Sequence, residues 1–214
     1  MTQIDLATAV RLEHNLYQNF ARRRGWRQDY LKDPEPDIST FLTCLPGAAR
    51  MLDAGCGWAR YVHFFLDAEI EYVGLDFSSE MLAAATETYP DCRFVEGSVA
   101  EMPLPGNSFD GVWSCCVLTS IPKAYIVKVL QEHYRVLKPG GVLYVALPHC
   151  YESSDVMFGD VDCTCLTGAI YHTEEFQFCL RRAGFVVEEA RERDESCSHY
   201  FIARKPRQAE EDLV

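Results

Sequence analysis

The sequence predicts one α/β domain, built as a doubly wound, mostly parallel sheet with helices on both faces. Three observations predict this class. Short β-rich segments alternate with amphipathic segments from residue 50 onward, and a glycine-rich turn at 55–57 follows the first of them. The length of 214 residues suits one substantial core with little left for a second domain. Because parallel neighbours need a crossover connection, this alternation places helices on both faces of the sheet.

The region before the first β-rich segment is predicted to form an N-terminal helix over residues 5–21, followed by a polar lead-in. A short helix through Phe41 and Leu45 ends at Pro46-Gly47, where the alternation begins. We expect three regions along the chain. They are residues 1–38, the N-terminal helix and lead-in; residues 39–206, the main domain; and residues 207–214, a flexible acidic tail.

Five segments have the composition of strands that alternate with helices or loops. They are residues 50–53, 71–76, 93–96, 109–113 and 142–147. Ser78 is expected to cap the helix after the second strand, with Glu80 in its first turn. The helix before the fifth strand has apolar positions three or four apart, ending with Leu137, and is expected to stop at Lys138-Pro139-Gly140-Gly141.

The C-terminal part has one helix and two strands. Thr173 is expected to cap that helix, and Gly184 to end it. The strands at 185–189 and 199–203 have no helix between them, so they should pair antiparallel. The fold class is therefore α/β: a single doubly wound, Rossmann-like, seven-stranded sheet that is mostly parallel, with the last strand antiparallel.

Composition excludes several classes of function. The formal net charge of −12 repels phosphate backbones, so nucleic acid is not an expected partner. No run of eighteen apolar residues occurs, so no membrane span is expected. The N-terminus lacks the basic and apolar pattern of a secretory signal, which predicts a cytoplasmic protein with reduced thiols. Most of the ten cysteines are expected to be small buried hydrophobic residues.

The turn Asp53-Ala54-Gly55-Cys56-Gly57 is the predicted cradle for a ligand. Its glycines permit unusual backbone angles and leave no side chain between the backbone and the ligand. Arg60 stands where a dinucleotide fingerprint needs its third glycine, so a nucleoside without a pyrophosphate fits better. Asp76 ends the second strand, where a carboxylate can accept hydrogen bonds from both hydroxyls of a ribose. The alternative is that Asp76 caps the following helix.

Four segments resemble successive motifs of the class I S-adenosylmethionine-dependent methyltransferases, in the same order and at matching spacing. They are Leu52–Gly57, Gly74–Ser78, Phe109–Ser114 and Leu137–Gly141. The resemblance covers roughly residues 40–204, and four motifs together are far more specific than one pair of glycines.

The resemblance implies that S-adenosylmethionine is the cofactor, with the glycine turn under its methionine part and Asp76 on its ribose. The cofactor-binding residues that it implies are Asp53, Ala54, Gly55, Cys56, Gly57, Asp76, Phe77, Met81, Gly97, Ser98, Val99, Ser114 and Cys115. Ser98 stands where relatives place an acidic residue toward the adenine amino group. Ala59 replaces a third glycine, a change expected to cost little because alanine tolerates helical geometry. Core packing is the alternative role for Phe77 and Cys115.

Three residues are candidates for the acceptor side of the reaction. His149 directly follows the fifth strand, and Tyr171 and His172 precede the last helix. A general base is optional, because the sulfonium is already an activated leaving group. A structural role is the alternative for each histidine. The aperiodic segment 150–168 is expected to form part of the acceptor pocket or its lid.

Tyr17 and Tyr30 are expected to close that pocket from the N-terminal side, with core packing as the alternative for Tyr17. Cys163 and Cys165 raise a metal or metalloid alternative, but they lack the paired spacing of a zinc site, and no metal site is predicted.

The sequence thus predicts methyl transfer from S-adenosylmethionine to a small-molecule acceptor. Two alternatives stay open: a non-catalytic module of the same fold that binds the cofactor or a partner, and a thiol-rich arsenic methyltransferase. The identity of the acceptor and the oligomeric state are not determined by the sequence.

Overall fold

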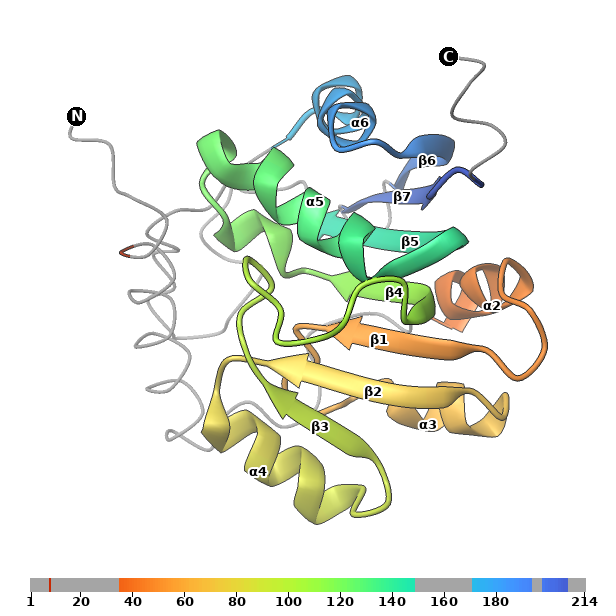
Figure 1. Cartoon of the computed structure of the whole chain (residues 1–214), viewed down its shortest axis with the longest axis vertical. Coiled ribbons are helices and arrows are strands. Elements are labelled where there is room, and N and C mark those ends of the chain that lie inside the picture. The colour runs from red at the N-terminus through yellow and green to blue at the C-terminus, as the bar shows by residue number, and fades with distance from the viewer. Residues whose placement is uncertain (1–7, 9–34, 149–170, 194–197, 208–214) are drawn as a thin grey trace.

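The structure, a computed structural model, describes residues 8, 35–148, 171–193 and 198–207 and has the predicted class (Figure 1). A seven-stranded sheet has the order β3-β2-β1-β4-β5-β7-β6. The strands are β1 Arg50–Ala54, β2 Glu71–Asp76, β3 Arg93–Glu96, β4 Phe109–Cys115, β5 Leu137–Pro148, β6 Val186–Arg193 and β7 Ser198–Arg204. The α-helices are α2 Glu35–Thr43, α3 Val62–Asp67, α4 Ser79–Thr88, α5 Ile126–Val136 and α6 Thr173–Arg182, and two short 3-10 helices cover Leu118–Ser120 and Lys123–Tyr125.

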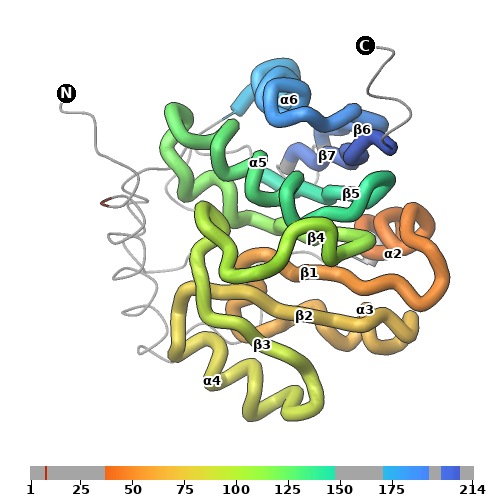
Figure 2. The backbone as a smooth tube through the Cα atoms, viewed as in Figure 1, coloured from red at the N-terminus to blue at the C-terminus, as the bar shows by residue number. Residues whose placement is uncertain are grey.

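The order of the strands reverses between β1 and β4. The chain runs outward from β1 to β2 and β3, and then returns to place β4 and β5 on the other side of β1 in parallel pairing. β7 pairs antiparallel with both β5 and β6, which confirms the prediction for the last two strands. Figure 2 shows β3 and β6 at opposite edges of the sheet. In a doubly wound sheet, ligands bind beyond the carboxyl ends of the strands at such a reversal.

Alternate residues of each central strand pack on opposite faces of the sheet. Leu52 and Val112 belong to a core cluster that also contains buried residues of α5 and α6. Met51 and Trp113 belong to a second cluster with buried residues of α2 and α3. The indole of Trp113 stacks on Tyr144 of β5 with ring centroids 3.9 Å apart. Both faces of the sheet are therefore buried, as parallel sheets require.

Several boundaries differ from those predicted, among them the starts of α2 and β5. α2 begins at Glu35, within the segment expected to be a polar lead-in. β5 begins at Leu137, five residues earlier than expected, because Leu137 pairs with Phe109 of β4. Gly140 has a φ of 83°, and its N–H donates to the carbonyl of Lys205 at 2.8 Å. The Lys138–Gly141 motif is therefore an irregular part of the strand, held by the C-terminal segment.

The predicted helix caps are right in one case and wrong in another. The Ser78 hydroxyl accepts a hydrogen bond from the N–H of Met81 at 3.3 Å and caps α4 as predicted. Thr173 is the first helical residue of α6 and not its cap. Its hydroxyl instead bonds with Glu192 at 2.5 Å and with His199 Nδ1 at 2.8 Å, which ties the start of α6 to the last two strands. Among the described residues, no helix is long and apolar enough to cross a membrane.

Candidate cofactor site

The candidate site lies at the carboxyl ends of β1, β2 and β4, beside the reversal in strand order. The turn after β1 is bound to the end of β2, because the N–H groups of Gly55 and Cys56 donate to the carbonyl of Leu75 at 2.7 Å and 3.0 Å. The register pairs Asp53 with Gly74 of β2 and with Trp113 of β4. The sheet thus brings the turns after β1 and β2 and the end of β4 to one edge, while Leu137–Gly141 pairs with the start of β4 at the opposite edge.

The two glycines of the turn serve different purposes. Gly55 has a φ of 85°, and a Cβ there would lie 2.3 Å from a methyl carbon of Val117. Gly57 has a φ of 54°, and a Cβ there would meet no atom of the described residues within 4 Å. Gly55 therefore lets the turn pack against the segment after β4, while Gly57 presents bare backbone to the site.

Ala59 corrects one sequence expectation. Its φ is 61°, in the left-handed region and not in the helical geometry that the expected low cost assumed. A left-handed alanine costs roughly 1–2 kcal/mol, because its Cβ approaches the following carbonyl oxygen. The methyl group of Ala59 is fully buried in the core cluster with α2 and α3. Alanine at this position therefore gains packing at the expense of backbone strain.

Asp76 joins the turn after β1 to the turn after β2. One carboxylate oxygen accepts a hydrogen bond from the N–H of Gly57 at 2.9 Å, and the other accepts from the N–H of Ser78 at 2.9 Å. The side chain is 9% exposed. Since Ser78 itself caps α4, the alternative that Asp76 is the helix cap is wrong. The carboxylate instead fixes the bare backbone of Gly57 next to the end of β2.

Asp53 lies beneath the turn, where its carboxylate accepts a hydrogen bond from the Tyr72 hydroxyl at 2.8 Å. Burial raises the pKa of Asp53 to about 7; the bond from Tyr72 lowers it, and the charge of Asp76 raises it further. Sequence reasoning missed Tyr72. Gly74 pairs with Asp53, and Tyr72 lies two residues before Gly74, so its side chain is on the same face of β2. This spacing was the available signal.

The end of β4 carries Ser114 and Cys115, and Cys116 follows directly after the strand. Ser114 is fully buried, and its hydroxyl has no hydrogen-bond partner in the described part of the chain. The Cys115 thiol donates to the sulfur of Cys116 at 3.8 Å, which lowers the pKa of Cys116 and raises that of Cys115. Cys115 is half-buried and packs against the core cluster, so it has the packing role that the sequence offered as the alternative.

The loop after β3 lies beside the end of β2. The N–H of Gly97 donates to the carbonyl of Asp76 at 2.9 Å. The Ser98 hydroxyl accepts from the N–H of Ala100 at 3.1 Å, so it stabilises its own turn. Val99 is buried in the core cluster with α5. The structure thus places the predicted adenine-side segment next to Asp76.

On the other side of Asp76, Phe77 is half-buried and Met81 is buried at the start of α4. Both residues therefore lie in the turn and helix that directly follow β2.

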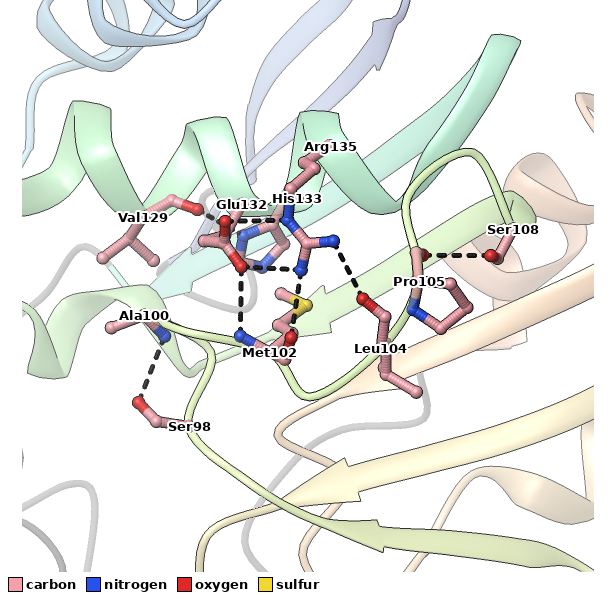
Figure 3. A network of polar contacts seen from close by, with 10 residues as sticks. All are labelled: Ser98, Ala100, Met102, Leu104, Pro105, Ser108, Val129, Glu132, His133 and Arg135. Carbon is pink, nitrogen blue, oxygen red and sulfur yellow. Dashed lines mark hydrogen bonds and ion pairs between the residues drawn. The ribbon is translucent and has the colours of Figure 1, made fainter.

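A polar network joins the same loop to α5 at residues 102–104 (Figure 3). Glu132 and Arg135 of α5 bond to one another and to the backbone of Met102, and Arg135 also bonds to Leu104. Sequence reasoning missed both residues. Their separation of three positions on a helix was the available signal, but that spacing also fits an ordinary surface ion pair.

Two of the three acceptor-side candidates lie within the described residues. Tyr171 is 4% exposed and packs edge-on against Phe176 of α6, and Lys123 Nζ lies 4.8 Å from the centre of its ring. Burial raises the pKa of its hydroxyl, and this hydroxyl has no hydrogen-bond partner among the described residues. His172 is exposed immediately before α6.

His149, Tyr17, Tyr30, segment 150–168 and the Cys163–Cys165 pair lie outside the described residues. Within the described ranges, no group of three metal-ligating side chains is present.

The comparisons with known proteins agree with this geometry. Residues 52–145 match the family described as "Methyltransferase domain". This part of the chain is similar to the class I S-adenosylmethionine-dependent methyltransferases. The cofactor of that family is S-adenosylmethionine.

Two curated relatives are named for different acceptors. The demethylmenaquinone methyltransferase of Bacillus licheniformis is 34% identical over 148 residues, which cover 66% of this chain and 57% of the relative. The malonyl-[acyl-carrier protein] O-methyltransferase of Pectobacterium atrosepticum is 31% identical over 134 residues, which cover 60% of this chain and 51% of the relative. The chain spans about half the length of the curated relatives that it matches.

Solved structures share the fold at low identity. The 1,6-didemethyltoxoflavin-N1-methyltransferase of Burkholderia thailandensis, solved with 1,6-didemethyltoxoflavin and S-adenosylhomocysteine, has a TM-score of 0.71 and 19% identity over 96% of this chain and 92% of that one. The S-adenosylmethionine-dependent methyltransferase of Mesorhizobium loti has a TM-score of 0.64 and 18% identity over 80% and 97%.

The residues of the site fit a cofactor of this kind. A Cβ on Gly57 would meet no atom of the described residues, and Ser114 holds a buried hydroxyl with no partner among them. The buried carboxylate of Asp76 stands at the point where the ribose is expected. Bare backbone, a hydroxyl and a carboxylate suit a polar nucleoside without phosphates.

Proposed function

We propose that the chain is an S-adenosylmethionine-dependent methyltransferase that acts on a small-molecule acceptor. The observation that carries this proposal is the junction made by Asp76. Its buried carboxylate accepts from Gly57 and joins two turns at the carboxyl ends of β1 and β2. A carboxylate beside the glycine turn supports the proposal, because it can accept hydrogen bonds from the hydroxyls of a ribose.

The cofactor supplies a methyl group on a sulfonium, which leaves binding, orientation and exclusion of water to the chain. In this proposal the turn at residues 53–57 and Ser114 hold the methionine part, and Asp76 holds the ribose hydroxyls. Phe77 and Met81 pack beside the adenine. The N–H of Val99 donates to an adenine ring nitrogen.

A small acceptor is supported by three observations. The net charge of −12 opposes binding of a polynucleotide. One structural neighbour was solved with the small molecule 1,6-didemethyltoxoflavin. One group of curated relatives is named for demethylmenaquinone, a small acceptor, and this is the first to assay; malonyl-[acyl-carrier protein], for which other relatives are named, is attached to a protein and is the competing acceptor to assay.

Proton transfer on the acceptor side is assigned to His149 or His172, if the acceptor needs it. Tyr171 stays protonated because burial raises its pKa, so we assign it hydrogen-bond donation.

The test has two stages. Purified protein is titrated with S-adenosylmethionine, S-adenosylhomocysteine and NADH, and the two sulfur nucleosides are expected to bind. Transfer of a labelled methyl group is then assayed with demethylmenaquinone analogues, malonyl-[acyl-carrier protein] and a panel of small hydroxyl, amine and thiol acceptors. Binding of NADH alone would overturn the proposal. Tight binding of S-adenosylhomocysteine without transfer to any acceptor would favour the non-catalytic module.

A further inference from the structure

The loop between β3 and β4, residues 97–108, is bonded to α5 at two places: Asn107 and Ser108 donate to backbone carbonyls of α5, and the bend at residues 102–104 is held by one ion pair. Glu132 accepts a hydrogen bond from the N–H of Met102 at 3.0 Å. Arg135 donates to the carbonyl of Met102 at 3.0 Å and to the carbonyl of Leu104 at 2.8 Å. Figure 3 shows both side chains of α5 reaching this one bend of the loop. Three backbone groups of the loop therefore depend on two side chains.

The ion pair itself is a two-pronged contact. Arg135 Nε donates to one carboxylate oxygen of Glu132 and Arg135 Nη2 to the other, both at 2.9 Å. The bond from Arg135 lowers the pKa of Glu132, so the carboxylate stays ionised at neutral pH. An exposed ion pair by itself adds little stability, but this one fixes two planar groups in the orientation that reaches the loop.

The bonded bend is packed against the nucleoside side of the site. Met102 and Leu104 flank Pro103, and both are buried. A Cβ on Gly97 would lie 2.5 Å from Cδ of Pro103, so the proline ring sits directly on the backbone of Gly97. Gly97 in turn donates to the carbonyl of Asp76. Any shift of residues 102–104 is therefore transmitted to Gly97 and to the residues that follow it.

We propose that Glu132 and Arg135 are positioning residues, which hold Ser98 and Val99 in place for the adenine of the cofactor and so set nucleoside affinity and base selectivity. This inference rests on the proposed function, because it takes residues 97–99 as the adenine-side segment. Neither side chain contacts the adenine in this scheme. Both act through the bend at 102–104.

The experiment compares Arg135→Ala with wild type, Arg135→Lys and Arg181→Ala. Arg181 is a matched control, since it lies on α6, and its guanidinium donates to Gln177 of the same helix. Each protein is titrated calorimetrically with S-adenosylhomocysteine and with S-inosylhomocysteine, which has a carbonyl in place of the adenine amino group.

Arg135→Ala is expected to bind S-adenosylhomocysteine about tenfold more weakly and to lose most of the preference for adenine over hypoxanthine. Arg135→Lys should fall between, because an ammonium can reach one carbonyl but cannot form the fork. Arg181→Ala should match wild type.

The decisive quantity is the ratio of the affinities for S-adenosylhomocysteine and S-inosylhomocysteine. A substitution that only destabilised the fold would leave this ratio unchanged. Hydrogen exchange of peptides covering residues 97–104 should rise in Arg135→Ala while exchange of β4 and β5 stays as in wild type. If Arg135→Ala does not fold, Glu132→Gln gives the same comparison, because it keeps the side-chain size and removes the charge.

Two negative results are distinguishable. Wild-type protein that fails to bind S-adenosylhomocysteine overturns the proposed function and this inference with it. Wild-type protein that binds, with an unchanged affinity and ligand ratio in the folded variants, overturns the positioning role alone.

Discussion

Replacing Asp53 by asparagine should raise the free energy of unfolding at alkaline pH and remove the contribution of this carboxyl group to the pH dependence of stability. Asp53 lies buried beneath the glycine turn, and its pKa is raised from 3.8 to about 7, chiefly by burial. Asparagine has nearly the same shape and keeps an oxygen that can accept from the Tyr72 hydroxyl. The substitution therefore removes the titration while preserving the packing.

The sign and size follow from linkage. Between the unfolded and folded pKa values, the folded protein holds a proton on Asp53 that the unfolded chain has lost. The stability from this group is complete below the unfolded pKa and is lost as the pH rises through about 7. The slope is about 1.4 kcal/mol per pH unit, so the advantage of Asp53→Asn over wild type should grow by about 3 kcal/mol between roughly pH 5 and pH 8.

The assay is urea denaturation followed by tryptophan fluorescence at half-unit intervals of pH. The difference between the two proteins is the decisive quantity, because His133 contributes in the opposite sense. Its pKa is lowered to about 4 by burial, so acid destabilises the protein through this group over an overlapping range. Both proteins contain His133, and its effect cancels in the difference.

Tyr72→Phe is the control for the hydrogen bond. The bond from Tyr72 lowers the pKa of Asp53, so its loss should extend the pH-dependent decline above about pH 7. A stability difference between wild type and Asp53→Asn that stays constant from about pH 5 to pH 8 would show that Asp53 is ionised in the folded protein throughout. That result would refute the reasoning.

Four further outcomes are expected. Asp76→Ala should weaken S-adenosylhomocysteine binding by about 1.5–3 kcal/mol, because the ribose and the N–H of Gly57 both lose a charged acceptor. Calorimetry on folded protein measures this affinity, and an affinity equal to that of wild type would show that Asp76 does not hold the ribose. Gly55→Val should damage binding at least as much, since its Cβ would clash with Val117 at 2.3 Å, and the fold is checked separately by circular dichroism. His149→Ala should slow methyl transfer by about 10²–10⁴-fold with cofactor affinity unchanged if His149 is a general base, whereas normal activity per folded molecule would end that assignment. Lys205→Met should lower the free energy of unfolding by about 2–4 kcal/mol, because the Lys205 ammonium donates to three buried or half-buried oxygens at 2.8–2.9 Å. Urea denaturation measures this loss, and an unchanged midpoint would contradict the prediction.

The structure also changes the reason for one of these expectations. From sequence, a side chain at position 55 was expected to occupy cofactor space. The packing shows that Val117 already fills the space where a Cβ of Gly55 would stand. At Gly57, by contrast, a Cβ would meet no atom of the described residues, so Gly57→Ala should test contact with the cofactor more directly. The φ of 54° at this position adds backbone strain to that variant.

Several features could be predicted from the sequence because they depend on local chemistry. Alternating β-rich and amphipathic segments predicted the seven strands and their order of appearance, since strand and helix periodicities are set by neighbouring residues. The glycine turn and the Ser78 cap were predicted for the same reason. Both are decided by residues within four positions of one another.

The remaining features were decided only by tertiary structure, because they join residues far apart in the chain. The carboxylate of Asp76 reaches Gly57 across 19 positions, and Arg135 reaches Met102 across 33. No periodicity encodes such contacts. The left-handed backbone of Ala59 is likewise set by the packing of the turn, and alanine by itself would favour a helix. The sequence therefore determined which elements form, while the packing of the sheet decided which polar groups meet at the ends of its strands.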